Sequence, residues 1–142
     1  MSDTISRSGR CLCGAVTLSA ERISKQVGAC HCDMCRRWGG GPLMSVDCGD
    51  AVQWRGQTHI GVYASSDWAE RGFCSQCGSH LFYRLKESGQ YIVPVGLFAD
   101  EPDFVFDHQV FIDEKPHYYQ FANKTQDMTG AEIFAKYGAT QD

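Results

Sequence analysis

Eight cysteines, most of them in tight clusters, constrain this 142-residue chain more than any other feature of its sequence. Seven of them fall in three short motifs: Cys11-Leu12-Cys13, the stretch CHCDMC at positions 30–35, and Cys74-Ser75-Gln76-Cys77. Cysteines separated by one or two residues can turn their thiolates toward one metal ion. Clustering at these spacings therefore predicts metal sites rather than disulfides, and thiolate-only ligand sets favour Zn²⁺.

Length, charge and hydropathy narrow the class of protein. A chain of this length fits one domain with an ordinary hydrophobic core, so we expect a single domain over residues 1–142. The start of the chain is polar and no apolar run reaches the length of a membrane span, which favours a cytoplasmic protein with no membrane partner. The net charge of −4 argues against general nucleic-acid binding.

Hydrophobic patterning predicts a β-rich domain. Runs that alternate or are rich in aromatic and β-branched residues predict short strands at 15–19, 44–48, 52–54, 59–63, 81–85, 91–95 and 105–112. One short C-terminal helix is expected, because Thr129 and Glu132 form a capping box and Gly138 follows the apolar pattern. A shorter turn of helix is expected after Cys32. The cysteine clusters then lie at strand ends and turns.

The first expected zinc site has four thiolates, from Cys11, Cys13, Cys74 and Cys77. Two thiolates from the C-x-x-C pair cannot complete a tetrahedron, so this pair needs two more ligands. In an extended segment Cys11 and Cys13 point to the same side, with Leu12 turned toward the core. Such a closed site is typical of structural zinc.

The second expected zinc site has three thiolates, from Cys30, Cys32 and Cys35. Strand alternation makes His31 point away from its neighbours, which favours a packed or hydrogen-bonded histidine over a ligand. Three thiolates leave one coordination position open, and an open position is typical of a catalytic zinc rather than a structural one. Such a zinc could polarise a carbonyl oxygen or bind a substrate thiolate.

Spacing alone leaves a second grouping possible. Cys32 and Cys35 could share one ion with Cys74 and Cys77, as in a zinc ribbon. The other three clustered cysteines, Cys11, Cys13 and Cys30, would then need a fourth ligand such as Cys48. Cys48 lies in a predicted strand and is most simply a buried thiol.

The order of these motifs resembles the glutathione-dependent formaldehyde-activating enzyme family, also called the GFA or CENP-V domain. The matching stretches are GRCLCGAV (9–16), CHCDMCRRWGG (30–40), SSDWAERGFCSQCGSHLFYR (65–84) and VPVGLFADEP…HQVFIDEKPHYY (93–119). The resemblance implies a β-tent fold, a structural zinc on Cys11, Cys13, Cys74 and Cys77, and a catalytic zinc on Cys30, Cys32 and Cys35. It also implies a carbon–sulfur lyase that makes or cleaves S-hydroxymethylglutathione from glutathione and formaldehyde.

The residues after the third thiolate suggest where a substrate would bind. Arg36, Arg37 and Trp38 could hold the carboxylates of a glutathione-like thiol, although solvated arginines and a core tryptophan explain the same residues. The expected partner is thus a small thiol or aldehyde, and the sequence does not determine the oligomeric state.

Two other functions remain open at this point. In a non-catalytic zinc-binding module both zincs would be structural, and Cys48, His80 or His108 would supply a fourth ligand to the second ion. In a redox enzyme such as a methionine sulfoxide reductase, Cys48 would be the nucleophile, but no base or activating cation lies near it in the sequence.

Overall fold

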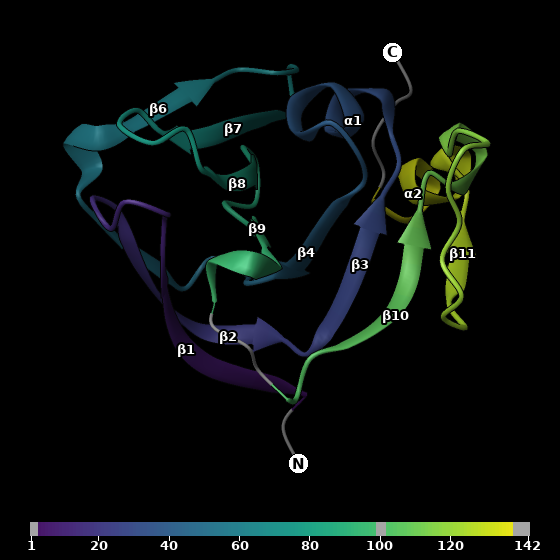
Figure 1. Ribbon diagram of the computed structural model, residues 1–142, viewed down its shortest axis with the longest axis horizontal. Coiled ribbons are helices and arrows are strands. Elements are labelled where there is room, and N and C mark those ends of the chain that lie inside the picture. Colours follow the sequence, from purple (N-terminus) through teal and green to yellow (C-terminus); the bar gives the residue numbers. More distant parts are fainter. Residues whose placement is uncertain (1–2, 99–101, 138–142) are drawn as a thin grey trace. The chain divides into compact units, whose positions relative to one another are not determined.

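The computed structural model describes residues 3–98 and 102–137. The chain forms two compact units that alternate along the sequence. The first comprises Met1–Lys25 and Ser45–Phe104, and the second comprises Gln26–Met44 and Val105–Asp142. Strands predominate over helices in the described residues as a whole, which confirms the predicted β-rich class (Figure 1). Across the described ranges, no helix is both long and apolar enough to cross a membrane.

The first unit is built from antiparallel strands. Three of them form a sheet in the order β1-β2-β5, with bounds Thr4–Arg10, Thr17–Ser24 and Val52–Arg55. Five more pair in the order β4-β9-β8-β7-β6, with bounds Leu43–Asp47, Tyr91–Pro94, His80–Leu85, Ala69–Cys74 and Ile60–Tyr63. Two 3₁₀ helices, η1 (Gln57–His59) and η2 (Val95–Leu97), complete the unit.

The core of the first unit is aliphatic at its centre and aromatic at one end. The side chains that are almost completely buried include Val16, Ile23, Val46, Leu81 and Val93. An aromatic group packs beside them, in which the rings of Trp54, Phe82 and Tyr91 contact one another at centroid distances of 5.1–5.7 Å. Apolar burial of this extent supplies the main stabilisation of the two sheets.

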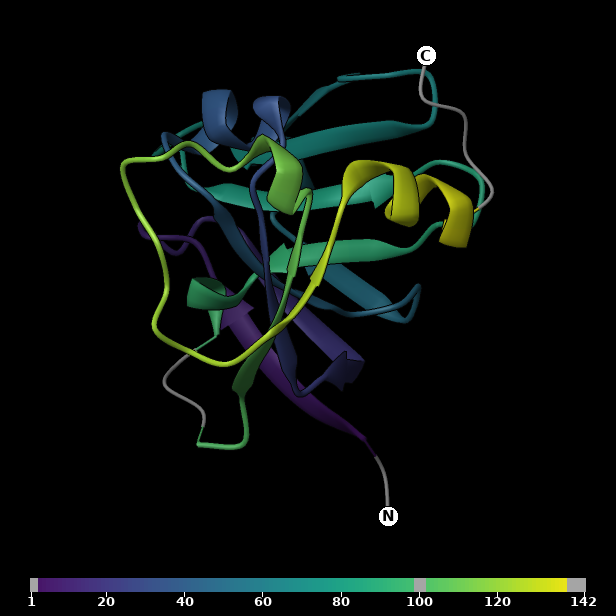
Figure 2. The same cartoon turned by 90° about the vertical axis from the view of Figure 1, so that its right-hand side faces the viewer.

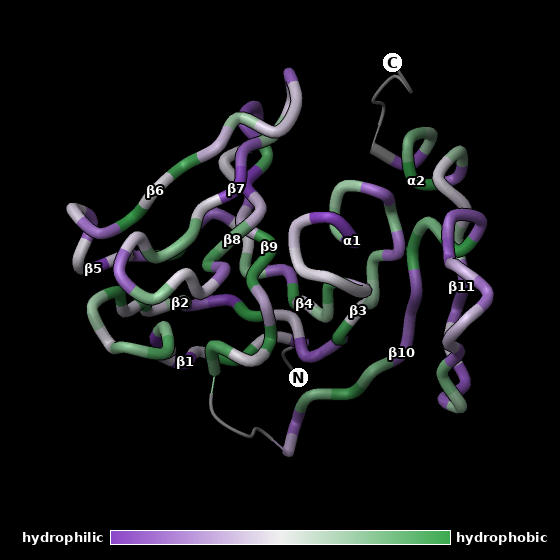
Figure 3. The backbone as a smooth tube through the Cα atoms, turned by 45° about the horizontal axis from the view of Figure 1, so that its top comes forward, coloured by the Kyte–Doolittle hydropathy of each residue, from purple (hydrophilic) through white to green (hydrophobic). Residues whose placement is uncertain are grey.

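The second unit has a small parallel sheet and two helices. Strands β3 (Gln26–Cys30) and β11 (Gln126–Met128) both pair in parallel with β10 (Val105–Val110). Helix α1 (Asp33–Gly39) follows β3, the 3₁₀ helix η3 (Ile112–Glu114) follows β10, and α2 (Gly130–Tyr137) follows β11 (Figure 2). Hydropathy along β10 is unusual, because its ends are apolar and its middle is hydrophilic (Figure 3).

Helix α2 begins as its sequence predicts. The hydroxyl of Thr129 accepts a hydrogen bond from the amide of Glu132 at 3.2 Å, and the carboxylate of Glu132 accepts one from the amide of Thr129 at 3.0 Å. This reciprocal pair is the expected capping box. The expected end of the helix at Gly138 lies outside the described residues. The ring of Phe134 packs edge-on against Phe111, which holds the helix in the second unit.

Three strand glycines are each covered by a ring from the neighbouring strand. In the sheet registers Gly28 lies opposite His108, and Gly72 lies opposite Phe82. A methyl group added to Gly28 would lie 2.2 Å from the His108 ring, and one added to Gly72 would lie 2.2 Å from the Phe82 ring. Gly61 is covered by Phe73 in the same way. Glycine is therefore required by close packing at these positions.

Candidate metal centres

The first cluster joins two turns of the first unit. Cys11 and Cys13 lie in the turn that follows β1, whereas Cys74 ends β7 and Cys77 lies in the turn before β8. The four Sγ atoms all lie within 4.8 Å of one another. Leu12 connects the two turns, because its amide donates to the Ser79 hydroxyl at 3.0 Å. The four expected cysteines are thus brought together, and they form this cluster without Cys32 or Cys35.

Glycine makes both turns possible. The amide of Gly78 donates to the Cys74 carbonyl at 2.8 Å, and the amide of Gly14 donates to the Cys11 carbonyl at 3.2 Å. Each glycine has a φ of +80°, a conformation that other residues adopt at a cost. Cys11 and Cys13 therefore converge through a turn, and the expected extended segment is wrong. As a result Leu12 is 81% exposed and does not enter the core.

The sulfur spacing in the first cluster fits a metal ion. The Sγ atoms of Cys11 and Cys13 are 3.7 Å apart, and those of Cys13 and Cys74 are 3.8 Å apart. A tetrahedral zinc with Zn–S bonds of about 2.3 Å requires S···S separations of about 3.8 Å. Backbone groups also point toward the sulfurs, since the amide of Val16 donates to the Cys11 Sγ at 3.4 Å. The donor set and its spacing match a four-thiolate metal site.

The electrostatics of the first cluster also favour a cation. Hydrogen bonds from the hydroxyl and then the amide of Ser79 lower the pKa of Cys77 to about 5. A backbone hydrogen bond from Ala15 lowers the pKa of Cys13, but burial and the other three thiols outweigh it and raise that pKa to about 11. Neighbouring thiols thus oppose each other's ionisation. A bound dication would remove that opposition and allow all four to be thiolates.

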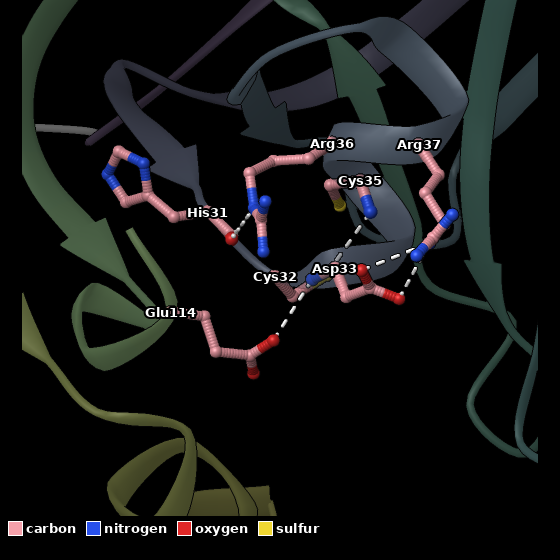
Figure 4. Close-up of polar contacts among 7 residues, drawn as sticks. All are labelled: His31, Cys32, Asp33, Cys35, Arg36, Arg37 and Glu114. Carbon is pink, nitrogen blue, oxygen red and sulfur yellow. Dashed lines mark hydrogen bonds and ion pairs between the residues drawn. The ribbon is translucent and has the colours of Figure 1, made fainter. Parts of the chain in front are cut away.

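The second cluster lies where β3 passes into α1. Cys30 is the last residue of β3, Cys32 is the N-cap of α1, and Cys35 is buried in the first turn of that helix. Their Sγ atoms lie within 4.8 Å of one another. The Sγ of Cys32 also accepts a hydrogen bond from the amide of Cys35 at 3.3 Å (Figure 4). The expected set of three cysteines is therefore brought together within a single unit.

The three thiols of the second cluster oppose each other's ionisation, as those of the first cluster do. Hydrogen bonds with Cys32 and Cys35, and then burial, raise the pKa of Cys30 well above 9.0. A single thiolate in this cluster therefore suppresses the ionisation of its neighbours, unless a cation is present. The donor atoms and their burial fit a soft or borderline metal ion held by three sulfurs.

The second cluster has three members in the part of the chain that the structure describes. Neither Cys48, His80 nor His108 joins the group, although each was a candidate for a fourth ligand. Cys48 is completely buried, and burial raises its pKa to about 12. The Nδ1 of His108 hydrogen-bonds to Asp107 at 2.8 Å. All eight cysteines lie in the described ranges, and none forms a disulfide.

His31 lies between Cys30 and Cys32 in the sequence, and its ring points away from Cys32 and Cys35 (Figure 4). Its side chain is fully buried, its Nδ1 lies 2.7 Å from the Tyr119 hydroxyl, and its Nε2 lies 2.7 Å from Gln109 Oε1. Burial lowers its pKa, which favours the neutral ring. The prediction of a packed, hydrogen-bonded histidine is confirmed. Its two partners are 78 and 88 residues away in the sequence, and no local pattern indicated them.

The two arginines after the third cysteine have different environments. The carboxylate of Asp33 accepts two hydrogen bonds from the Nε of Arg37, whose side chain is 80% exposed. Arg36 is half-buried, and its Nε donates to the carbonyl of His31 at 2.9 Å. Within residues 3–98 and 102–137, neither Nη atom of Arg36 hydrogen-bonds to another side chain. Trp38 is also half-buried, in the same helix.

Comparison with known proteins agrees with this geometry. Residues 6–114 match the family model described as "Glutathione-dependent formaldehyde-activating enzyme", GFA. The chain belongs to the GFA family. The GFA match covers both cysteine clusters, all of β3 and β10, and the Arg36–Trp38 segment. It ends before Tyr119.

Two other proteins extend the comparison. A Schizosaccharomyces pombe protein named as an uncharacterized lyase is 38% identical over 126 residues, covering 88% of this chain and 92% of its own. A crystal structure of a Rhodobacter sphaeroides protein is similar in fold, with a TM-score of 0.58 and 24% sequence identity. That likeness covers 67% of this chain and 91% of the other.

Proposed function

We propose that this GFA-family protein is a zinc-dependent lyase that makes or cleaves the carbon–sulfur bond of a thiol–aldehyde adduct. S-hydroxymethylglutathione, formed from glutathione and formaldehyde, is the adduct that the family description suggests. The lyase class is supported by that description and by the name of the yeast relative. The observation that carries the proposal is the cluster of three sulfurs, which leaves a tetrahedral ion one position short.

Different residues of the second unit would bind the metal ion and the substrate. Cys30, Cys32 and Cys35 would hold the ion, and a zinc ion held there supplies a Lewis acid for an aldehyde oxygen or a site for a thiolate sulfur. The Nη atoms of Arg36 would bind a carboxylate of the thiol substrate, since guanidinium and carboxylate pair through two parallel hydrogen bonds. Trp38 would contribute an apolar wall. Holding both reactants in one site would contribute to the rate increase by making the reaction effectively unimolecular.

The reaction itself needs few further groups. In the cleavage direction the hydroxyl of the adduct loses its proton, a carbonyl forms, and the electron pair of the C–S bond passes to sulfur. The released thiolate then takes up one proton, so that aldehyde and thiol are the only products. The first cluster has no part in these steps, because its four sulfurs already complete a tetrahedron.

The test is the exchange rate between glutathione and formaldehyde, measured by NMR exchange spectroscopy against the spontaneous reaction. We expect the zinc-loaded protein to accelerate exchange, and Cys35→Ser to abolish the acceleration. Absence of glutathione binding at millimolar concentration, together with an exchange rate equal to the spontaneous one, would contradict the proposed substrate.

The role of Arg36 has its own test. We expect Arg36→Ala to raise the KM for glutathione about tenfold, which corresponds to the loss of one charged hydrogen-bonded pair. Arg37→Ala is the matched control and should change KM less than about twofold, because its guanidinium is exposed and already bonded to Asp33. The KM for 2-mercaptoethanol, which has no carboxylate, should be unchanged in both variants. An equal rise for both thiols would assign Arg36 a structural role instead.

The second candidate is a non-catalytic module in which both zincs are structural. It requires a fourth protein ligand on the second ion. X-ray absorption on the native protein loaded with two zinc ions distinguishes the two: three protein ligands on the second ion support the lyase, and four protein ligands on each ion, whether sulfur or histidine nitrogen, support the module. The third candidate, a redox enzyme using Cys48, is disfavoured because that thiol is completely buried and its pKa is raised to about 12.

A further inference from the structure

The backbone between Cys30 and Cys32 is held at both polar groups of His31. The amide of His31 donates to the Val110 carbonyl at 3.2 Å, and the carbonyl of His31 accepts from Arg36 Nε at 2.9 Å. Two residues further on, the amide of Asp33 donates to the Glu114 carboxylate at 3.0 Å (Figure 4). The loop is thus tied to β10, η3 and α1, all within the second unit.

The His31 ring continues this anchoring on the side away from the sulfurs. A series of side-chain hydrogen bonds runs from His31 through Gln109 and Thr125 to Asp127. The direction of each bond follows from the last member of this series, because the exposed carboxylate of Asp127 can only accept. Thr125 donates its hydroxyl proton to Asp127 at 2.6 Å, so its oxygen accepts from Gln109 Nε2 at 2.9 Å. The amide oxygen of Gln109 therefore faces His31 and accepts from Nε2–H at 2.7 Å.

This series of hydrogen bonds selects one tautomer of the His31 imidazole. In the neutral ring, a proton on Nε2 leaves Nδ1 as an acceptor, so the Tyr119 hydroxyl must donate to it. Tyr119 is held in turn by Lys115, whose ammonium group donates to the Tyr119 carbonyl and lies 5.2 Å from the centre of its ring. The Asp127 end of the series opens on a cavity of about 400 Å³ lined by Gln109, Thr125 and Asp127, where solvent can hydrate the Asp127 carboxylate.

We infer that His31 is the positioning residue of the three-cysteine cluster: its ring, held as the Nε2–H tautomer between Gln109 and Tyr119, sets the directions of Cys30 and Cys32. A rigid ring with a donor at one nitrogen and an acceptor at the other meets both partners at once. Fixing the loop in this way means that less conformational entropy is lost when an ion binds. The inference rests on the metal-site part of the proposed function and is independent of the substrate.

The first test measures metal affinity at each cluster. Zn²⁺ is titrated in competition with a chromophoric chelator, and Co²⁺ is used as a second probe because thiolate-to-cobalt absorption reports on the ligand geometry. We expect Gln109→Leu and Tyr119→Phe to weaken binding at the second cluster about 10- to 100-fold, the usual effect of losing a group that orients a metal site. Binding at the first cluster should not change, because its four cysteines belong to the other unit.

Two neighbouring residues provide matched controls. Tyr118→Phe removes the same hydroxyl from a side chain that is 69% exposed, and Gln120→Leu makes the same change as Gln109→Leu at an exposed position. Both should leave the two metal affinities as they are. The steps of the titration are assigned with Cys35→Ser, which retains the first cluster alone.

The second test observes the ring directly. Long-range ¹H–¹⁵N spectra of the zinc-loaded protein should show His31 as the Nε2–H tautomer, and Tyr119→Phe should alter its Nδ1 shift. Observation of the Nδ1–H tautomer would overturn the inference, as would unchanged affinity at the second cluster in both Gln109→Leu and Tyr119→Phe. Equal weakening of both clusters would also overturn it, since that result indicates general destabilisation. Binding of one zinc by the native protein would instead contradict the proposed function.

Discussion

The two cysteine clusters use the same ligand atom, but they differ in how far apart their cysteines lie in the sequence and in how many sulfurs they contain. The first joins segments 61 residues apart and contains as many sulfurs as a tetrahedron requires. The second gathers its three sulfurs from six consecutive positions and relies on distant, non-ligand residues to shape the loop. A metal in the first cluster therefore cross-links the fold, whereas a metal in the second adds little to it. This difference is what we expect if the first cluster is a structural site and the second is the catalytic site that we propose.

Removing a sulfur from the first cluster should have the largest effect. Zinc binding to thiolate sites contributes about 10–16 kcal/mol, which is comparable to the total stability of a domain of about 5–15 kcal/mol. We expect Cys77→Ser to lower the free energy of unfolding by about 5 kcal/mol or more, seen as insoluble protein or a lost thermal transition. A variant that melts within a few degrees of the native protein would contradict a structural role for this cluster.

A cysteine-to-serine substitution in the second cluster should destabilise the fold less, but it should abolish activity. We expect Cys35→Ser to lose the second metal and the exchange activity, while the free energy of unfolding falls by about 1–3 kcal/mol, as for an ordinary buried substitution. Metal analysis and denaturant unfolding measure the two effects. Unfolding as severe as that of Cys77→Ser would remove the distinction between the clusters.

Chelation should separate the clusters in time. A tetrahedral ion held by the three sulfurs of the second cluster would have a coordination position open to a chelator, whereas an ion held by the four sulfurs of the first would not. We expect two phases of zinc release: a fast one with an almost unchanged far-UV circular dichroism spectrum, and a slow one that accompanies unfolding. Simultaneous release of both ions would mean that the clusters are not independent.

A pair of glycine variants should sharpen the comparison at the smallest scale. Gly78 follows the last cysteine of the first cluster and Gly40 caps the helix of the second, with φ values of +80° and +84° and open space around both. Each change to alanine should cost about 1–2 kcal/mol in backbone strain. Only Gly78→Ala should make zinc easier to remove from the first cluster. Equal effects of both variants on that release rate would show that strain at the turn is irrelevant to it.

Local sequence patterns predicted the elements that carry their own signals. Strands β5, β6, β8, β9 and β10 lie where alternating or aromatic-rich runs predicted them, and α2 has the predicted capping box. The cysteine spacing likewise predicted the two groups of sulfurs that the structure brings together. In each case the residues that decide the structure are close in sequence.

The strands that were missed, β1, β3, β7 and β11, have no alternating or aromatic-rich run of their own. Strands β3 and β7 each contain a glycine whose missing side chain is replaced by a ring from the next strand, so neither segment has a strand pattern of its own. The burial of Arg71, whose guanidinium lies 4.9 Å from the Tyr83 ring, further disguises β7. The parallel pairing of β10 with β3 and the partners of His31 could not be predicted, because the residues that meet there lie far apart in the sequence.

The alternation of the two units along the chain has a consequence for biosynthesis. The stretch CHCDMC is made with the first segment of the second unit, but Gln109 and Tyr119 follow only after most of the first unit. A nascent chain thus presents three unshaped thiols while the remainder is still being translated. We expect correct metallation of the second cluster to be among the last events of maturation, which makes this site the one most exposed to oxidation or to the wrong metal in the cell.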